Sequence, residues 1–333
     1  MDIRNVRQLK TFAAQRLEHA RDAKPIVLIY SGLVLGLSVL TSLVNFLFSL
    51  QISRFGGLSN LGTRTLLSSV QSMLPIAQTL VVMCLDLGYL AAMLRIARGQ
   101  YASPQTLRLG FDRFWTLLRL NVIKGLIFFA LGFACIYLSV MIYMMTPLSR
   151  PVMELLLPLV NDMSILSSGL VLDETVSAQL MSMMGPLFLL CSVVYCAVAA
   201  PIAYQYRMAD YVVIDRPALG AVAALRESRK MMRGNRLALL RLDLGLWWYY
   251  GALLLASAVC YGDQLLPLLG VTLPLSADAA YYLFYLIYLA LLFAAYYFLR
   301  SRAEVTYALA YDAIKPAEDQ NGGTVLGSIF NKN

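Results

Sequence analysis

Three polar side chains within one apolar segment are the first candidates for chemistry. Gln71, Gln78 and Asp86 lie in the segment 66–94, with Pro75 between the first two. At helical spacing the three side chains lie roughly along one side of a helix. A polar stripe beside a proline kink is what a path for an ion or a small solute would use.

Asp86 carries the strongest energetic argument in this stripe. It lies nine positions before Arg95, and so about 13 Å along a helix from that residue. A carboxylate at the centre of a membrane helix costs about 3 kcal/mol on insertion scales, so it faces the helix bundle or a partner. The structural alternative is that Asp86 pairs with an inner-end arginine such as Arg95 or Arg207, or snorkels, while Gln71 and Gln78 bond neighbouring helices. No second buried acid or cation is evident to complete a relay, which favours this alternative.

A basic stripe is the second candidate site. Arg226, Arg229, Lys230 and Arg233 share one helical face. The other face carries apolar or small residues, namely Ala221, Leu225, Ser228 and Met232. The cations could dock lipid headgroups or a soluble partner. Equally, the stretch could be a structural elbow that orients the next apolar segment, and Gly234-Asn235 suits a left-handed helix stop after it.

No catalytic or metal-binding pattern accompanies these residues. The sequence has no G-x-S-x-G, no H-E-x-x-H and no glycine loop that could cradle a phosphate. A single histidine, His19, and five cysteines without a C-x-x-C pair give no metal-ligand set. We therefore expect no catalytic residue, no metal and no cofactor, and we do not expect an enzyme.

Six long apolar segments must position these side chains. They cover about residues 26–50, 66–94, 121–145, 185–206, 245–267 and 281–299. Each has about 19 or more residues, enough at ~1.5 Å rise per residue to cross a ~30 Å hydrocarbon layer. Hydrophobic residues make up 59% of the chain and charged residues 14%, which excludes a water-soluble core of this size. The sequence therefore predicts an all-α polytopic membrane protein with six transmembrane helices.

Basic residues mark one side of this predicted bundle. Of the 27 Lys and Arg, only Arg54, Arg64 and Arg150 fall between the spans on the other side. The positive-inside rule places both termini in the cytoplasm of a bacterial cytoplasmic membrane. A net charge of +8 with this distribution suits anionic membrane lipids as partners. Nucleic acid is not expected, because the basic residues lie beside the spans rather than in one compact patch.

A basic amphipathic helix is expected before each odd-numbered span, on the cytoplasmic side. The first covers residues 3–24, the second begins at Ser103-Pro104, and the third begins near Asp215-Arg216-Pro217. Their apolar stripes include Val6, Leu9, Ala13, Leu17 and Ala20 in the first, and Leu107, Phe111, Phe114 and Leu118 in the second. Such helices tend to lie in the interface plane, so we expect a basic collar. The alternative is three solvated connectors whose charges serve only topology.

Residues 1–315 are expected to form a single membrane domain. The outer loop 146–184 is long, apolar and acidic, so it could form interfacial helices or a partner-binding lid. The cytoplasmic tail 316–333 is expected to be disordered.

Two groups of letters resemble a known family. The first group is Leu87-Gly88-Tyr89, Leu94 to Gln100 and Gly110-Phe111. The second is Tyr206 to Tyr211, Asp215 to Pro217, Ala224 to Asn235 and Leu240 to Leu244. Over most of residues 4–315 the chain resembles the bacterial integral-membrane family catalogued as domain of unknown function nine-seven-five, common in Gram-positive bacteria.

The resemblance implies a multi-span membrane protein without an assigned activity, and it brings no catalytic or binding residues. A distant likeness to the membrane domain of some glycerophosphodiester phosphodiesterases suggests a lipid-related role. Two departures affect the outer face. The loop 146–184 replaces a short turn, and Gly245 to Trp248 replace the family's Phe-Ile-Gly-Trp.

The leading hypothesis is a non-enzymatic membrane protein with an organising or accessory role. Its basic collar would engage anionic lipid, or another membrane or cytosolic protein. The alternative is a transporter of small solutes or lipid that uses Gln71, Gln78 and Asp86. No oligomeric state is predicted.

Overall fold

The computed structural model describes residues 5–20, 22–54, 61–154, 174–268 and 277–315. Throughout these ranges the secondary structure is helical, without a strand. The chain forms two compact units, Met1–Arg119 with Met208–Asn333, and Leu120–Arg207.

The candidate spans confirm an all-helical polytopic protein. Within the described ranges, five helical stretches are long and apolar enough to cross a membrane. They are α2 (Ala23–Arg54), α3 (Leu61–Ala97), α5 (Phe114–Met144), α8 (Glu174–Tyr206), and α14 (Ala277–Ala294) with its continuation through η4 (Ala295–Arg300) and α15 (Ser301–Ile314). A sixth candidate is a bent pair, α11 (Arg236–Gly245) and α12 (Trp247–Cys260), which meet at 63°.

Several helix bounds differ from the sequence prediction. Helix α8 begins at Glu174, inside the expected outer loop, and the last helical stretch continues past residue 299 to Ile314. The expected span 245–267 breaks at Tyr261, where α12 gives way to α13 (Gly262–Leu268). The middle of the expected outer loop and the expected disordered tail lie outside the described residues, and the single domain stays a prediction.

The bend before α12 is fixed by polar contacts on both sides. Lys10 in α1 (Val6–His19) donates a hydrogen bond to the carbonyl of Gly245, the last residue of α11. Tyr307 in α15 donates a hydrogen bond to Asp243, and its hydroxyl lies 2.6 Å from that of Tyr250 in α12. A helix end leaves its last carbonyls without helical partners, and Lys10 provides one for the carbonyl of Gly245. The bonds of Tyr307 join α15 to both α11 and α12, so the contacts together stabilise the break.

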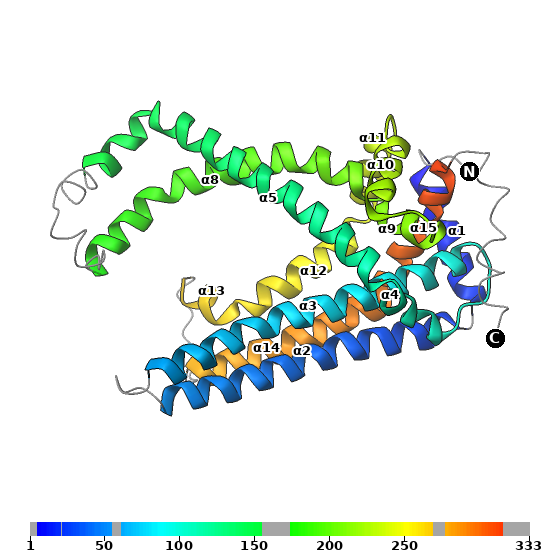
Figure 1. Ribbon diagram of the computed structural model, residues 1–333, viewed down its shortest axis with the longest axis horizontal. Coiled ribbons are helices and arrows are strands. Elements are labelled where there is room, and N and C mark those ends of the chain that lie inside the picture. Colours follow the sequence, from blue (N-terminus) through cyan, green and yellow to red (C-terminus); the bar gives the residue numbers. More distant parts are fainter. Residues whose placement is uncertain (1–4, 21, 55–60, 155–173, 269–276, 316–333) are drawn as a thin grey trace. The chain divides into compact units, whose positions relative to one another are not determined.

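Helix α3 lies at the centre of the first unit. It packs along α2, and its C-terminal half also contacts α15 and η2 (Pro104–Arg108) (Figure 1). Tyr89, Met93 and Leu94 are fully buried in this half of the helix. The packed core of the unit is therefore at the end of α3 where the charged clusters described below also lie.

Two glycines allow the segment that contains η2 and α4 to pack directly against the backbone of α3. A Cβ added to Gly88 would lie 2.3 Å from the carbonyl oxygen of Leu107 in η2. A Cβ added to Gly110, in α4 (Leu109–Asp112), would lie 1.8 Å from the carbonyl oxygen of Cys84 in α3. Both distances are shorter than any real contact, so only glycine fits at these two positions.

Replacement of Gly110 by alanine is expected to lower the free energy of unfolding by about 1–3 kcal/mol, because the added methyl group meets backbone that must move. Thermal unfolding of the detergent-solubilised protein, followed by circular dichroism, measures the change. Gly36→Ala is the control, because a Cβ at Gly36 in α2 would meet nothing within 4 Å. If the two variants had the same melting temperature, the close backbone contact between Gly110 and Cys84 would be contradicted.

The expected amphipathic helices have mixed outcomes. Helix α1 forms, but its stripe residues Leu9 and Ala13 are buried, and α1 packs on α15 and α3. The second helix begins at Pro104 as expected, but it is a 3-10 turn, η2, and the Ser103 hydroxyl makes no capping hydrogen bond. The start expected near Asp215 for the third helix is wrong, because that residue ends α9 (Ala209–Asp215) and α10 (Ala221–Met231) begins after Gly220.

The second unit exposes apolar side chains along its helices. The part of α5 in this unit exposes Phe129 and Phe133, and α8 exposes Phe188 and Leu189. A Cβ added to Gly132 in α5 would lie 3.9 Å from the Tyr195 ring in α8. Exposed apolar helices of this kind are suited to a lipid environment.

Candidate functional site

A buried arginine lies where α14 passes into α15. Arg300 is the last residue of η4, a π-helix of six residues, and its side chain is 11% exposed. A π-helical turn is rare and occurs frequently at functional sites.

Arg300 forms a charged cluster with α2 and α3. Its Nη2 lies 2.8 Å from Asp86 Oδ1 in α3, and its Nη1 donates a hydrogen bond to the hydroxyl of Tyr30 in α2. That hydroxyl in turn donates to Asp86. Glu304 Oε1 lies 3.7 Å from Arg300 Nε, one turn along α15. The guanidinium is therefore placed between two carboxylates from different helices.

Three tyrosine rings surround the same guanidinium. The Arg300 Cζ lies 4.8 Å from the ring centre of Tyr30, 4.9 Å from that of Tyr296 and 5.3 Å from that of Tyr89. Tyr30 and Tyr89 stack with their centres 4.3 Å apart. Each such cation–π contact contributes about 0.5–2 kcal/mol. Within the described chain, the buried Tyr89 hydroxyl and Arg300 Nε have no hydrogen-bond partner.

The predicted polar stripe of α3 faces α2. Gln78 Nε2 lies 3.0 Å from Ser38 Oγ, and Gln71 Nε2 lies 3.4 Å from the carbonyl oxygen of Asn45. Asp86 accepts a hydrogen bond from the hydroxyl of Tyr30, which also lies in α2. The structure thus gives each of the three side chains a partner on α2, while their use as a path stays a prediction.

Asp86 pairs with an inner-end arginine, as the structural alternative expected, but the two arginines named as examples are wrong. Arg95 Nη1 lies 3.5 Å from Thr106 Oγ1, and the Arg207 guanidinium lies 5.8 Å from the Tyr204 ring. The partner is Arg300, which the sequence analysis left beyond the end of the last span. The expectation that no buried cation accompanies Asp86 is therefore also wrong. The run of tyrosines before Arg300 is the sequence signal that could have indicated this cluster.

A second charged cluster joins the ends of three helices. Arg98, at the end of α3, lies 2.8 Å from Asp215 Oδ1 and 2.6 Å from Asp312 Oδ1. Lys315 Nζ lies 2.7 Å from Asp215 Oδ2, and the Tyr311 hydroxyl donates to the same oxygen at 3.2 Å. Burial lowers the pKa of Arg98, but its hydrogen bonds to Asp312 and Asp215 raise it, and the net pKa lies above the ordinary value.

The backbone after α3 presents Arg98 to this cluster. Gly99 has a φ of 73°, its N–H donates to the carbonyl of Ile96, and the N–H of Gln100 donates to that of Arg95. These are the two hydrogen bonds of a Schellman motif, which requires the left-handed conformation that glycine adopts without strain. The helix therefore ends at Ala97 and leaves Arg98 beside α9 and α15.

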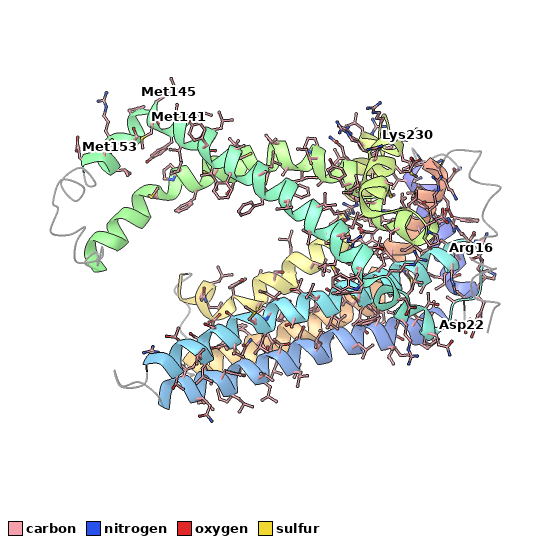
Figure 2. All side chains as sticks on the ribbon, in the orientation of Figure 1. Arg16, Asp22, Met141, Met145, Met153 and Lys230 are labelled. Carbon is pink, nitrogen blue, oxygen red and sulfur yellow. The ribbon has the colours of Figure 1, made fainter. Side chains whose placement is uncertain are left out.

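The predicted basic stripe lies on the surface of α10, with Arg233 two residues past the end of the helix. Arg226, Arg229, Lys230 and Arg233 are exposed, while Ala224, Leu225 and Ser228 are buried. Figure 2 shows nitrogen-bearing side chains gathered around Lys230. The left-handed stop after this helix is confirmed, because Gly234 has a φ of 84°.

These observations define the class of the molecule as an all-helical polytopic membrane protein with charged clusters between its helices. The chain belongs to the family described as protein of unknown function (DUF975), whose family model matches residues 5–318. The resemblance seen in the sequence is thus confirmed at the level of the family. No curated protein and no solved structure matches the chain.

The two groups of signature letters are in contact in the structure. Arg98 belongs to the first group and Asp215 to the second, and their side chains form an ion pair.

Proposed function

We propose that this protein is a non-enzymatic component of the bacterial cytoplasmic membrane, with both termini in the cytoplasm. Its basic collar engages anionic lipid headgroups, and its role is organising or accessory. The observation that supports this proposal best is the segregation of α10, where Arg226, Arg229 and Lys230 are exposed opposite a buried face and Arg233 is exposed just after the helix.

The energetics favour lipid as the partner of this surface. An anionic leaflet attracts each nearby Lys or Arg by about 1 kcal/mol. Arg98, Lys315 and Arg300 form ion pairs inside the protein, whereas Arg226, Arg229, Lys230 and Arg233 present their charge at the surface.

Charge reversal on α10 is expected to reduce the enrichment of anionic lipid around the protein. In the variant Arg226→Glu with Arg229→Glu and Arg233→Glu, each change removes about 1 kcal/mol of attraction and adds a repulsion, so the enrichment is expected to fall by at least about tenfold. The measurement is mass spectrometry of phosphatidylglycerol retained by protein extracted from vesicles of phosphatidylcholine and phosphatidylglycerol.

The matched control reverses Arg64 and Arg150, which are exposed and lie on the predicted outer side. Because it reverses two separate cations rather than a cluster, it is expected to lower the enrichment much less than the α10 variant. Wild-type enrichment in the α10 variant would contradict the proposal. Loss of a co-purifying protein without any change in lipid would indicate that α10 binds a protein instead.

A further inference from the structure

A groove opens between α1, the beginning of α2, and the junction of η4 with α15. Its volume is about 560 Å³, within the range of small-molecule pockets. Leu17, Val27, Tyr297 and Phe298 supply apolar surface, and the ionisable lining residues are Glu18, Lys24 and Arg302. The collar proposed above includes α1 but assigns it no discrete lipid site, and none of the lining residues of the groove belongs to α10.

The two walls of the groove have the same polarity gradient. On α2, exposed Lys24 is followed by Val27 in the lining of the groove; Leu28, one turn after Lys24, is 52% exposed but is not among the lining residues. On the other wall, exposed Arg302 is preceded about one turn earlier by Phe298, which is 63% exposed. Residues three or four apart on a helix lie on one face. Each wall therefore carries a cation at one level and an apolar side chain at the next, Val27 on α2 and Phe298 on the other wall.

This gradient matches the depth profile of a bilayer surface. The candidate span in α2 begins at Ala23, beside Lys24, and the apolar surface of Leu28 continues along it. Long basic side chains at span ends reach the headgroup region, while the apolar residues that follow meet acyl chains. An occupant must then be amphiphilic, with its polar group at the level of the two cations.

The charge of the lining selects among amphiphiles. Lys24 and Arg302 contribute two positive charges and Glu18 one negative charge, which leaves a net charge of +1. A monoanionic phosphodiester balances that charge. Glu18 can accept a hydrogen bond only from a headgroup that has a donor, and the glycerol hydroxyls of phosphatidylglycerol provide one.

We propose that this groove binds one phosphatidylglycerol molecule. Its phosphodiester lies between Lys24 and Arg302, a headgroup hydroxyl donates to Glu18, and an acyl chain lies along Val27 and Phe298. The site differs from the general attraction of α10 for anionic lipid, so either proposal can fail without the other.

Native mass spectrometry of the full chain tests the site. The protein is extracted from vesicles that contain equal amounts of phosphatidylglycerol, phosphatidylethanolamine and phosphatidylcholine. The wild type is expected to retain one phosphatidylglycerol. Lys24→Gln with Arg302→Gln is expected to lose most of this adduct, and Ala14→Trp, which fills the groove without changing a charge, is expected to lose it too. Melting by circular dichroism verifies that both variants are folded.

The α10 charge-reversal variant is the matched control, and it is expected to keep the single adduct while it loses general enrichment. Retention of the adduct by folded Lys24→Gln/Arg302→Gln protein would overturn the proposal. Equal retention of phosphatidylethanolamine by the wild type would also overturn it, as would the absence of any bound lipid.

Discussion

Replacement of Arg300 by leucine is expected to lower the free energy of unfolding by about 3–5 kcal/mol, the loss typical when one partner of a buried ion pair is removed. The change takes the cation away from Asp86 and Glu304 and from the centre of three tyrosine rings. The Asp86 side chain is 39% exposed, so the lower end of this range is expected. Melting of the detergent-solubilised protein by circular dichroism measures the loss.

Two further variants identify the source of that loss. Arg241→Leu removes an exposed arginine and is expected to change stability by less than about 0.5 kcal/mol. Asp86→Leu combined with Arg300→Leu is expected to melt above Arg300→Leu alone, because an apolar pair leaves no uncompensated charge. If Arg300→Leu melted like Arg241→Leu, the cluster could not be what holds α2, α3 and α15 together.

The helices were predictable from the sequence because their cause is local. An apolar run long enough to cross a bilayer is visible in a short window, and so is a helix stop such as Gly234. Partners between distant segments are not visible in that way. Asp86 and Arg300 are 214 positions apart. The distribution of basic residues that predicted the topology placed Arg300 only on the cytoplasmic side, without a partner.

The amphipathic pattern of α1 shows a second limit of sequence reasoning. Spacing identifies which side of a helix is apolar, but not whether lipid or protein covers it. In α1 the residues Leu9 and Ala13 pack within the protein, so part of the stripe that predicted an interfacial helix is core. In α10 the same kind of pattern correctly predicted an exposed basic face, because Lys and Arg side chains are rarely buried without a partner.

The signature letters gain a physical meaning only in the folded chain. Gly88 and Gly110 are the positions where η2 and α4 touch the backbone of α3. Arg98 and Asp215, far apart in sequence, form one ion pair. The letters that identify the family therefore include positions that hold the first unit together, which explains why they indicated the fold without indicating an activity.

Replacement of Asp215 by alanine is expected to cost about 3–5 kcal/mol, because it removes the carboxylate that Arg98 and Lys315 share. The Asp215 side chain is only 4% exposed, so water cannot replace it without local opening. Arg98 then keeps Asp312, and the positive charge of Lys315 is no longer balanced by Asp215. Since these contacts tie α15 to α3 and α9, the damage should be greatest at the C-terminal end of α15.

Hydrogen–deuterium exchange distinguishes this local effect from general destabilisation. In Asp215→Ala, amides of residues 301–315 are expected to exchange faster, while those of α5 within the second unit keep their wild-type rates. The control is Asp112→Ala, which removes an exposed acid in the same unit and should leave both regions unchanged. Uniform acceleration over all helices would show that Asp215 supports the whole fold rather than the docking of α15. Unchanged exchange in 301–315 would show that Arg98 and Lys315 need no shared carboxylate, and the second cluster would then have no part in holding the three helix ends together.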